Sequence, residues 1–282
     1  MNLNEFKKEK DFLICVDSDG CAIDTMDIKH IRCFGPCMIT EWHLEKWQDE
    51  ILARWNEVNL YTMTRGINRF QGLLSALETV DEKYQTVQGL EELREWVTGT
   101  KELSNQALEK AIAATQSQIL RKALHWSVMV NNNIKLIPQE EKLAFDGVAF
   151  GLAHAHRFAD IAIVSSANSQ AVLDEWDVQG LLRHVDIVLA QDTGTKLYCL
   201  QELKKKGYEK DHILMVGDAP GDLAAAQQAE TLFFPILVKK EKESWAIFRS
   251  EAVEHFINES YAGAYAENNR KKFLENLSGG KE

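Results

Sequence analysis

Residues 12–24 read FLICVDSDGCAID, and this stretch decides the fold. Its first five residues are apolar, and Asp17-Ser-Asp-Gly follows at once. A short apolar run that ends at a polar, glycine-containing turn is typical of a buried β-strand. We therefore expect the first strand of a sheet here, with two carboxylates, Asp17 and Asp19, at its carboxyl end.

Four more apolar runs follow residue 145 and alternate with amphipathic segments. They are Ile161–Val164, Ile187–Leu189, Ile213–Val216 and Leu232–Ile236. Such alternation predicts a mostly parallel sheet covered by helices. Residues 25–140 have a helical periodicity instead. The predicted fold class is α/β, with a core of residues 1–24 and 141–282 and an all-helical domain, residues 25–140, inserted after the first strand.

Two long helices are expected within the inserted domain. One side of the first would carry Trp42, Trp47, Ile51, Trp55 and Val58, and Thr40 would cap it. The second would begin near Ser104 and stop at residues 131–133. The tryptophans of this domain are interpreted as core packing. After residue 241 we expect a helical tail that ends in a disordered segment, residues 278–282.

The composition is that of an acidic globular protein. The 282 residues include 32 Lys and Arg against 43 Asp and Glu, a formal net charge of -11. This balance repels phosphate backbones and anionic lipid heads, so neither nucleic acid nor a membrane is an expected partner. No run of about eighteen apolar residues could span a bilayer. Five scattered cysteines and a start without a signal-peptide pattern favour a reducing, cytoplasmic setting.

Polar residues follow the apolar runs, where the predicted strands end. After Asp17 and Asp19, the later ones are Ser165, Ser166, Lys196, Asp218 and Asp222. In an open parallel sheet the carboxyl ends of the strands meet at one crevice, so these side chains are expected to converge. Crowded carboxylates repel unless a cation neutralises them, and oxygen-only ligands favour Mg²⁺. Carboxylates, hydroxyls, an ammonium and Mg²⁺ are the groups that phosphoryl transfer requires.

Residues 17–25 resemble the first motif, DxDGTxxD[ST], of the haloacid dehalogenase superfamily, and specifically of its phosphatases. Ser165 matches the second motif of that family, Lys196 the third, and Gly217-Asp-Ala-Pro-Gly-Asp222 the fourth. The resemblance implies a Rossmann-like three-layer core. It also implies that the insert is the helical C1-type cap of subfamily I, as in β-phosphoglucomutase and phosphoglycolate phosphatase.

The resemblance also implies a role for each matching residue. Asp17 would be the nucleophile that forms an aspartyl-phosphate. Asp19 would protonate the leaving alcohol, deprotonate the attacking water, and offer Mg²⁺ its backbone carbonyl. Asp218 and Asp222 would complete the Mg²⁺ site with Asp17. The residues expected to bind phosphate are Ser165, Ser166 and Lys196.

Two positions depart from the family pattern. Cys21 stands where the family usually has Thr or Val, which removes a hydroxyl near the nucleophile. Lys196 lacks the proline that commonly follows this lysine, which makes it the least specific of the four matches. The alternatives, Lys204, Lys205 and Lys206, are interpreted as a solvated helix end.

Residues 64–70 of the insert, TRGINRF, resemble the cap segment of β-phosphoglucomutase-type members. By that resemblance Arg65 and Arg69 would reach a distal anionic or sugar group of the substrate, and a guanidinium suits a second phosphate or a carboxylate. The alternative interpretation of both arginines is as salt-bridging surface residues. The linkers at residues 21–24 and 141–147 are the expected hinge of the cap.

The predicted function is Mg²⁺-dependent hydrolysis of a small phosphorylated metabolite, by a monomer or homodimer. The presence of Asp19 argues against a dehalogenase, whose carbon chemistry needs no acid for the leaving group. Two alternatives stay open. One is a phosphomutase of the same superfamily, and the other is a binding protein that kept the fold and lost catalysis.

Overall fold

The computed structural model describes residues 3–278, which divide into two compact units. The core unit comprises the chain up to Met26 and from Gln139 onward, and the helical unit is Asp27–Pro138. Both boundaries lie two residues from those expected, 24/25 and 140/141. Apart from Ser278, the segment expected to be disordered lies outside the described residues.

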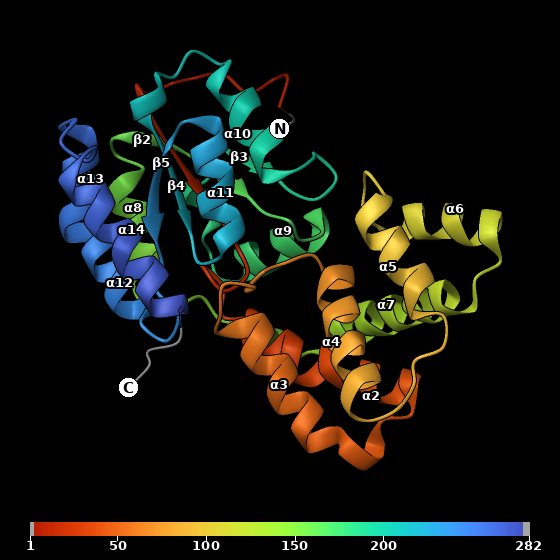
Figure 1. Cartoon of the computed structure of the whole chain (residues 1–282). Coiled ribbons are helices and arrows are strands. Elements are labelled where there is room, and N and C mark those ends of the chain that lie inside the picture. Colours follow the sequence, from red (N-terminus) through yellow and green to blue (C-terminus); the bar gives the residue numbers. More distant parts are fainter. Residues whose placement is uncertain (1–2, 279–282) are drawn as a thin grey trace. The chain divides into compact units, whose positions relative to one another are not determined.

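A five-stranded parallel sheet forms the centre of the core unit (Figure 1). Its strands are β1 (Phe12–Val16), β2 (Ala159–Val164), β3 (Ile187–Leu189), β4 (Ile213–Gly217) and β5 (Leu232–Pro235). Their order across the sheet is β3-β2-β1-β4-β5, so β1 is the central strand although it comes first in the chain. The α/β fold expected from the alternating apolar runs is confirmed.

Helices cover both faces of this sheet, which is why its central strands are apolar on both sides. Leu13, Ile14, Cys15 and Val16 of β1 are fully buried. In Figure 1, α10 and α11 lie on one face, and α8, α12, α13 and α14 lie on the other. The helices of this unit are α8 (Val148–Ala155), α9 (Ser169–Val178), α10 (Lys196–Lys204), α11 (Pro220–Ala229), α12 (Glu241–Ile247), α13 (Val253–Ile257) and α14 (Ala264–Leu277).

The helical unit has its own core, built around tryptophans and leucines. Trp126 is fully buried there, and its indole Nε1 donates to the Phe34 carbonyl at 3.1 Å. Trp55 packs edge-on against Trp126 with ring centroids 6.3 Å apart. The helices are α1 (Met26–Lys29), which begins at the unit boundary, α2 (Gly35–Trp42), α3 (Gln48–Leu60), α4 (Arg69–Lys83), α5 (Leu90–Gly99), α6 (Asn105–Thr115) and α7 (Gln118–Leu136).

Both long helices expected in this unit are interrupted, which corrects the sequence interpretation. The first ends at His43, whose φ of 54° is left-handed, and the chain resumes as α3. Thr40 therefore lies inside α2, where its hydroxyl donates to the Pro36 carbonyl, and caps nothing. The second breaks at Gln116, with a φ of 58°. The expected start is correct, because Ser104 is the N-cap of α6.

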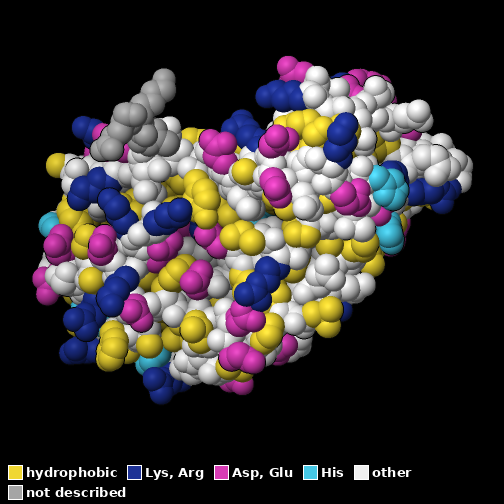
Figure 2. All heavy atoms as spheres, turned by 90° about the horizontal axis from the view of Figure 1, so that it is seen from below, with side chains coloured by type: hydrophobic (Ala, Val, Ile, Leu, Met, Phe, Trp, Pro, Cys, Tyr) yellow, Lys and Arg dark blue, Asp and Glu magenta, His cyan; other side chains and the backbone are white. Residues whose placement is uncertain are grey.

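The surface carries both signs of charge. On the face shown in Figure 2, Lys and Arg side chains are interspersed with Asp and Glu, without a continuous basic area. Among residues 3–278, no helix combines the length and the apolar character that crossing a bilayer requires.

Candidate active site

Asp17 directly follows β1, the central strand, and is buried. Its backbone N–H donates to the Val216 carbonyl of β4 at 3.0 Å, which continues the ladder one residue past the strand. The chain then turns sharply, because the Ser18 carbonyl accepts hydrogen bonds from the N–H groups of Ala22 and Ile23, both at 2.9 Å. This turn, residues 17–24, is called the nucleophile loop below, after the role that the sequence predicts for Asp17.

Asp218 and Asp222 come from the end of β4 and the first turn of α11. Asp222 Oδ2 accepts the Ala219 N–H at 3.0 Å, so the carboxylate also caps the helix that carries it. The Asp222 side chain lies directly on Gly217, where an added Cβ would be only 2.4 Å from it. Only glycine fits at residue 217 for this reason.

Lys196 is the first residue of α10, and Thr195 caps that helix. The Lys196 ammonium lies 2.8 Å from Asp17 Oδ2 and 2.5 Å from Asp222 Oδ1. Lys196, the least specific of the four motif matches, is therefore the lysine that reaches Asp17 and Asp222. Among the alternatives, Lys204 and Lys205 instead pair with Glu230 and Glu202.

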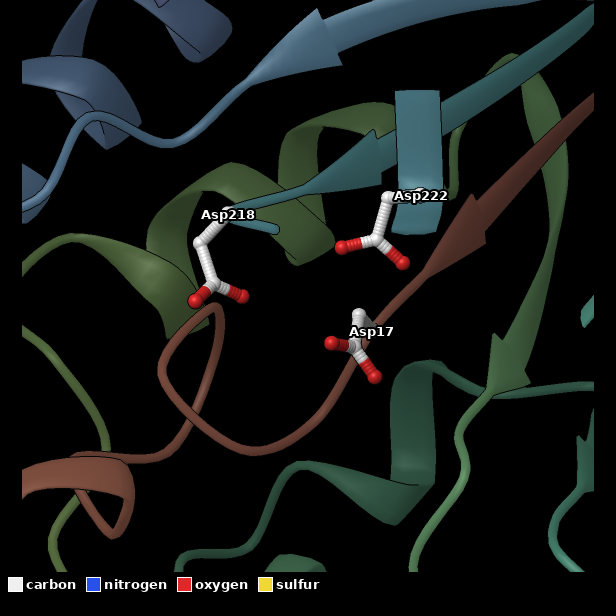
Figure 3. Close-up of side chains that lie close together, drawn as sticks. All are labelled: Asp17, Asp218 and Asp222. Atoms are coloured by element: carbon white, nitrogen blue, oxygen red, sulfur yellow. The ribbon is translucent and has the colours of Figure 1, made fainter. Parts of the chain in front are cut away.

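Three carboxylates converge in Figure 3, and Lys196 pairs with two of them. Asp17, Asp218 and Asp222 are all buried, and one oxygen of each lies within 4.8 Å of the others. Burial raises the pKa of Asp17 to about 8; Lys196 opposes this shift, and the neighbouring Asp222 and Asp218 add to it. Burial lowers the pKa of Lys196, but Asp17 and Asp222 outweigh burial and raise it above its ordinary value. Burial and the neighbouring carboxylates together thus outweigh the attraction of Lys196 in setting the pKa of Asp17.

The donor set fits a hard divalent cation. Its contributors are carboxylate oxygens without thiolate or imidazole, which is the chemistry that Mg²⁺ prefers. Three buried carboxylates face the single charge of Lys196, so an added cation would offset the repulsion that raises the pKa of Asp17. Asp17, Asp218 and Asp222 would hold the ion.

Asp19 lies in a different environment. Its side chain is half-buried and is not a member of the three-carboxylate cluster. Asp19 Oδ1 accepts a 2.6 Å hydrogen bond from the Thr25 hydroxyl, which is itself buried. Thr25 ends the motif that the sequence presented, but no role was predicted for it. The structure brings Asp17 and Asp19 onto one turn with different surroundings.

Cys21 belongs to the nucleophile loop and is fully buried, and its thiol lies 3.5 Å from the Val216 carbonyl. Burial, and after it the charges of Asp218 and Asp17, raise the pKa of this thiol well above its usual range. The thiol therefore stays neutral and acts as an apolar filler where the family usually has Thr or Val.

Ser165 and Ser166 follow β2, the neighbour of β1. Ser165 is buried, and its hydroxyl accepts the Ala167 N–H at 3.1 Å. Ser166 is exposed. Neither serine caps α9, because Asn168 does so by accepting from the N–H groups of residues 170 and 171. Binding of phosphate by these serines stays a prediction.

The two cap arginines make contacts within the helical unit. Arg65 is buried and donates to the Leu60 carbonyl at 2.6 Å. Arg69 donates to Asn131 Oδ1 at 2.7 Å, which ties α4 to α7, and its guanidinium lies 5.1 Å from the centroid of the Phe34 ring. Burial lowers the pKa of Arg69 to about 10, so it keeps its charge at neutral pH. A substrate contact by either arginine stays a prediction.

Two tryptophans reach the nucleophile loop from distant parts of the core unit. Trp176 of α9 donates to the Ser18 hydroxyl, and Trp245 of α12 donates to the Cys21 carbonyl. Sequence reasoning gave neither a role. Each belongs to an ordinary amphipathic segment, so no local pattern could have singled it out.

Comparison with a family model gives one match. The model of haloacid dehalogenase-like hydrolases matches residues 80–236, more than half of the chain. The match includes Ser165, Lys196, Asp218 and Asp222 and stops short of Asp17 at one end and Trp245 at the other. No curated protein matches the sequence.

Several solved structures are similar to the chain at low sequence identity. A candidate phosphoglycolate phosphatase from Lactobacillus delbrueckii subsp. bulgaricus is 15% identical, with a TM-score of 0.50 over 96% of this chain and 99% of its own. A hydrolase from Pseudomonas syringae is 11% identical, with a TM-score of 0.47 over 83% and 90%. The candidate hydrolase YfnB of Bacillus subtilis, solved with bound magnesium, is 13% identical, with a TM-score of 0.46 over 80% and 87%.

Proposed function

The chain belongs to the haloacid dehalogenase-like hydrolase family, and from this premise we propose that it is a Mg²⁺-dependent phosphatase of a small phosphorylated metabolite. Asp17 is the proposed nucleophile, and Asp19 the proposed acid and base. A reducing, cytoplasmic setting is part of the proposal.

The observation that carries the proposal is the contrast between these two carboxylates. Asp17 is buried against Lys196, Asp218 and Asp222, whereas Asp19 stands outside that cluster and is held by Thr25. A nucleophile must be ionised and fixed in place, while an acid and base must exchange its proton with substrate and water. Two carboxylates of one turn in two environments suit this division of labour.

The reaction proceeds in two steps that conserve charge and protons. An Asp17 carboxylate oxygen attacks phosphorus and forms the aspartyl-phosphate, while the bond from phosphorus to the substrate oxygen breaks. Protonated Asp19 gives its proton to that leaving oxygen, and the product alcohol departs. Asp19 then takes a proton from a water molecule whose oxygen attacks the phosphorus. The bond from phosphorus to the Asp17 oxygen breaks, which releases inorganic phosphate and the Asp17 carboxylate.

The remaining groups orient Asp17 and neutralise the negative charge of the phosphoryl group. Lys196 fixes one Asp17 oxygen and supplies positive charge for the transferred group, with the Ser165 hydroxyl as a further donor. A Mg²⁺ ion bound by the three aspartates would supply the charge that keeps Asp17 ionised and that compensates the phosphate. Cap residues Arg65 and Arg69 are kept as proposed contacts to the distal part of the substrate.

Asp19 also separates this proposal from carbon–halogen chemistry within the same family. A halide leaves as an anion without needing a proton, so a dehalogenase has no use for a second carboxylate that is held ready to deliver one. The hydrogen bond from Thr25 fixes the Asp19 carboxyl group, which suits a reaction whose leaving oxygen takes up a proton and departs as an alcohol.

A metabolite screen tests the proposal. The protein is incubated with sugar phosphates and phosphoglycolate-like acids, and inorganic phosphate is measured with Mg²⁺ and again with EDTA. We expect release from at least one compound that requires Mg²⁺. A transient burst of product without continued phosphate release would favour a phosphomutase instead. The absence of turnover across the panel, with Mg²⁺ bound, would favour a catalytically silent binding protein.

The role of Asp17 is tested by Asp17→Asn. Because the amide cannot form the acyl-phosphate, we expect phosphate release to fall by at least about 10⁴-fold, the scale seen when a nucleophile is removed. The matched control is Asp177→Asn, the same change at an exposed position of α9. Turnover by Asp17→Asn at the rate of the control would contradict the proposed mechanism.

A further inference from the structure

Two fully buried indole groups end on the nucleophile loop. Trp176 Nε1 donates to Ser18 Oγ at 2.9 Å, and Trp245 Nε1 donates to the Cys21 carbonyl at 2.9 Å. Ser18 lies between Asp17 and Asp19, and Cys21 is two residues after Asp19. Each indole thus fixes one side of the segment that carries both reactive carboxylates.

Two glycines leave the space in which the Trp245 side chain packs. An added Cβ on Gly151 of α8 would be 2.9 Å from Trp245 Cε3, and one on Gly147 would be 3.1 Å from Trp245 Cβ. Phe248 packs against the Trp245 indole, with the two ring centroids 5.1 Å apart. The indole therefore has little freedom to move, and its N–H is aimed at a fixed point of the loop.

Trp176 acts on the point from which the turn is organised. The Ser18 carbonyl accepts the N–H groups of Ala22 and Ile23, and the Ser18 hydroxyl accepts the indole of Trp176. Both side chains are fully buried, so water cannot replace the indole donor if it is lost. The main chain and the side chain of Ser18 are thus both held.

We propose that Trp176 and Trp245 are positioning residues that hold Asp17 and Asp19 in their working geometry. The inference rests on the proposed function of that loop and extends it to residues that do not touch the substrate. Trp245 lies beyond residue 236, where the family match ends, so the C-terminal helices become part of the working site. Neither indole is placed by any of the four motifs.

The first experiment replaces each tryptophan by phenylalanine, which keeps an aromatic ring and removes the donor. For Trp176→Phe and Trp245→Phe we expect kcat to fall about 10- to 100-fold with KM within about threefold, because small displacements of reacting groups slow the chemical step more than binding. The matched control is Trp126→Phe, which removes a buried indole bond to a carbonyl inside the helical unit. Its kcat should stay within about threefold of wild type. Equal kcat loss in all three variants would overturn the inference.

The second experiment does not depend on turnover. Titration with Mg²⁺ alone, by calorimetry, should show affinity about 10- to 100-fold weaker in both variants than in wild type, since groups that orient metal ligands have effects of this size. If wild type binds Mg²⁺ but hydrolyses nothing, the proposed function fails while this readout still decides the positioning role. Unchanged Mg²⁺ affinity together with unchanged kcat would reject it.

A milder substitution tests the role of Trp245 if Trp245→Phe fails to fold. Gly151→Ala keeps the indole of Trp245 but pushes its ring, and we expect the same loss of kcat and of Mg²⁺ affinity. Its control is Tyr261→Phe, which removes a buried donor between α13 and α14; the Tyr261 hydroxyl donates to the Phe233 carbonyl of β5 at 2.8 Å and not to the nucleophile loop. Tyr261→Phe should lower thermal stability and leave kcat unchanged. Normal kcat and Mg²⁺ affinity in folded Gly151→Ala would count against the role of Trp245.

A double-mutant cycle isolates the partner of Trp176. If this residue acts through Ser18, the pair Trp176→Phe with Ser18→Ala should lose no more kcat than the more damaging single change. Multiplied losses in the double variant would show that the two side chains act independently and would remove Trp176 from the proposal.

Discussion

Asp17 occupies a position from which most proteins exclude charge. Its carboxylate is buried, and the two carboxylates beside it outnumber the single ammonium of Lys196. Because burial raises the pKa of Asp17 to about 8, the protonated form is the one that the metal-free fold favours. A cation at this site therefore competes directly with a proton.

The first prediction concerns pH. A raised carboxyl pKa contributes stability below the unfolded-state pKa, and this contribution is lost as pH rises toward 8. We expect the Tm of the metal-free protein to fall between about pH 5 and 8.5, and the Tm gain from Mg²⁺ to be larger at pH 8.5 than at pH 6. Asp17→Asn should be more stable than metal-free wild type at pH 8.5 and should respond less to Mg²⁺. A Tm gain that is independent of pH would contradict the coupling.

The second prediction concerns Gly217, over which the Asp222 side chain lies. A methyl group at this residue would be 2.4 Å from Asp222, so Gly217→Ala must displace the carboxylate. We expect a loss of about 1–3 kcal/mol in the free energy of unfolding and a clear weakening of Mg²⁺ binding. Gly221→Ala is the control, since its Cβ would meet nothing within 4 Å. Denaturant titration and calorimetry of the pair measure both effects.

Among the elements, the strands and the helix start at Ser104 were predictable, and the breaks inside the two expected long helices were not. All five strands lie within two residues of the expected apolar runs, because burial on both faces leaves a continuous apolar signature. The helix breaks at His43 and Gln116 use left-handed residues that are neither glycine nor proline, so no residue type in the sequence marks these breaks. Asp17, Lys196 and Asp218 could be brought together from sequence because strand ends converge. The contacts of Trp176 and Trp245 with the nucleophile loop depend on how separate helices pack, and the periodicity of the sequence does not encode that packing.

A third prediction follows from the break at His43. A left-handed conformation disfavours any side chain with a Cβ, and His43 is exposed at the end of α2. His43→Gly should therefore raise the free energy of unfolding by about 0.5–1 kcal/mol. The same change inside a helix, Ala53→Gly in α3, should lower it by about 1 kcal/mol. Urea denaturation distinguishes the two; destabilisation by both would mean that the His43 side chain has a role of its own.

At the scale of the whole molecule, the insert leaves and re-enters the core unit at one place. The Asp24 N–H donates to the Leu143 carbonyl at 2.8 Å, the Phe145 N–H donates to the Ala22 carbonyl at 3.0 Å, and Ile23 bridges Ala144. The two linkers expected to serve as a hinge are thus paired with each other inside the core unit.

The fourth prediction is that the helical unit can be removed. Replacement of residues 27–138 by a Gly-Ser linker of about six residues joins ends that lie within four residues of the pairing between residues 22–24 and 143–145, so the core unit should fold and keep a Mg²⁺-dependent rise in Tm. Removal of residues 69–99 alone cuts through the core of the helical unit and should give an unstable protein. Circular dichroism and thermal melts compare the two. An unfolded core without the insert would mean that the helical unit stabilises it.

The position of β1 in the sheet has a consequence for synthesis on the ribosome. Phe12 pairs with Ala159, and Leu13 pairs with Ile213, so both neighbours of the first strand are translated much later. At about 5–20 residues per second, the first neighbour emerges roughly 7–30 s after β1 does. During that interval an apolar strand waits unpaired while the helical unit can already fold. Nascent chains stalled before residue 159 should therefore recruit chaperones to their N-terminal segment, and chains stalled well past residue 217 should release them.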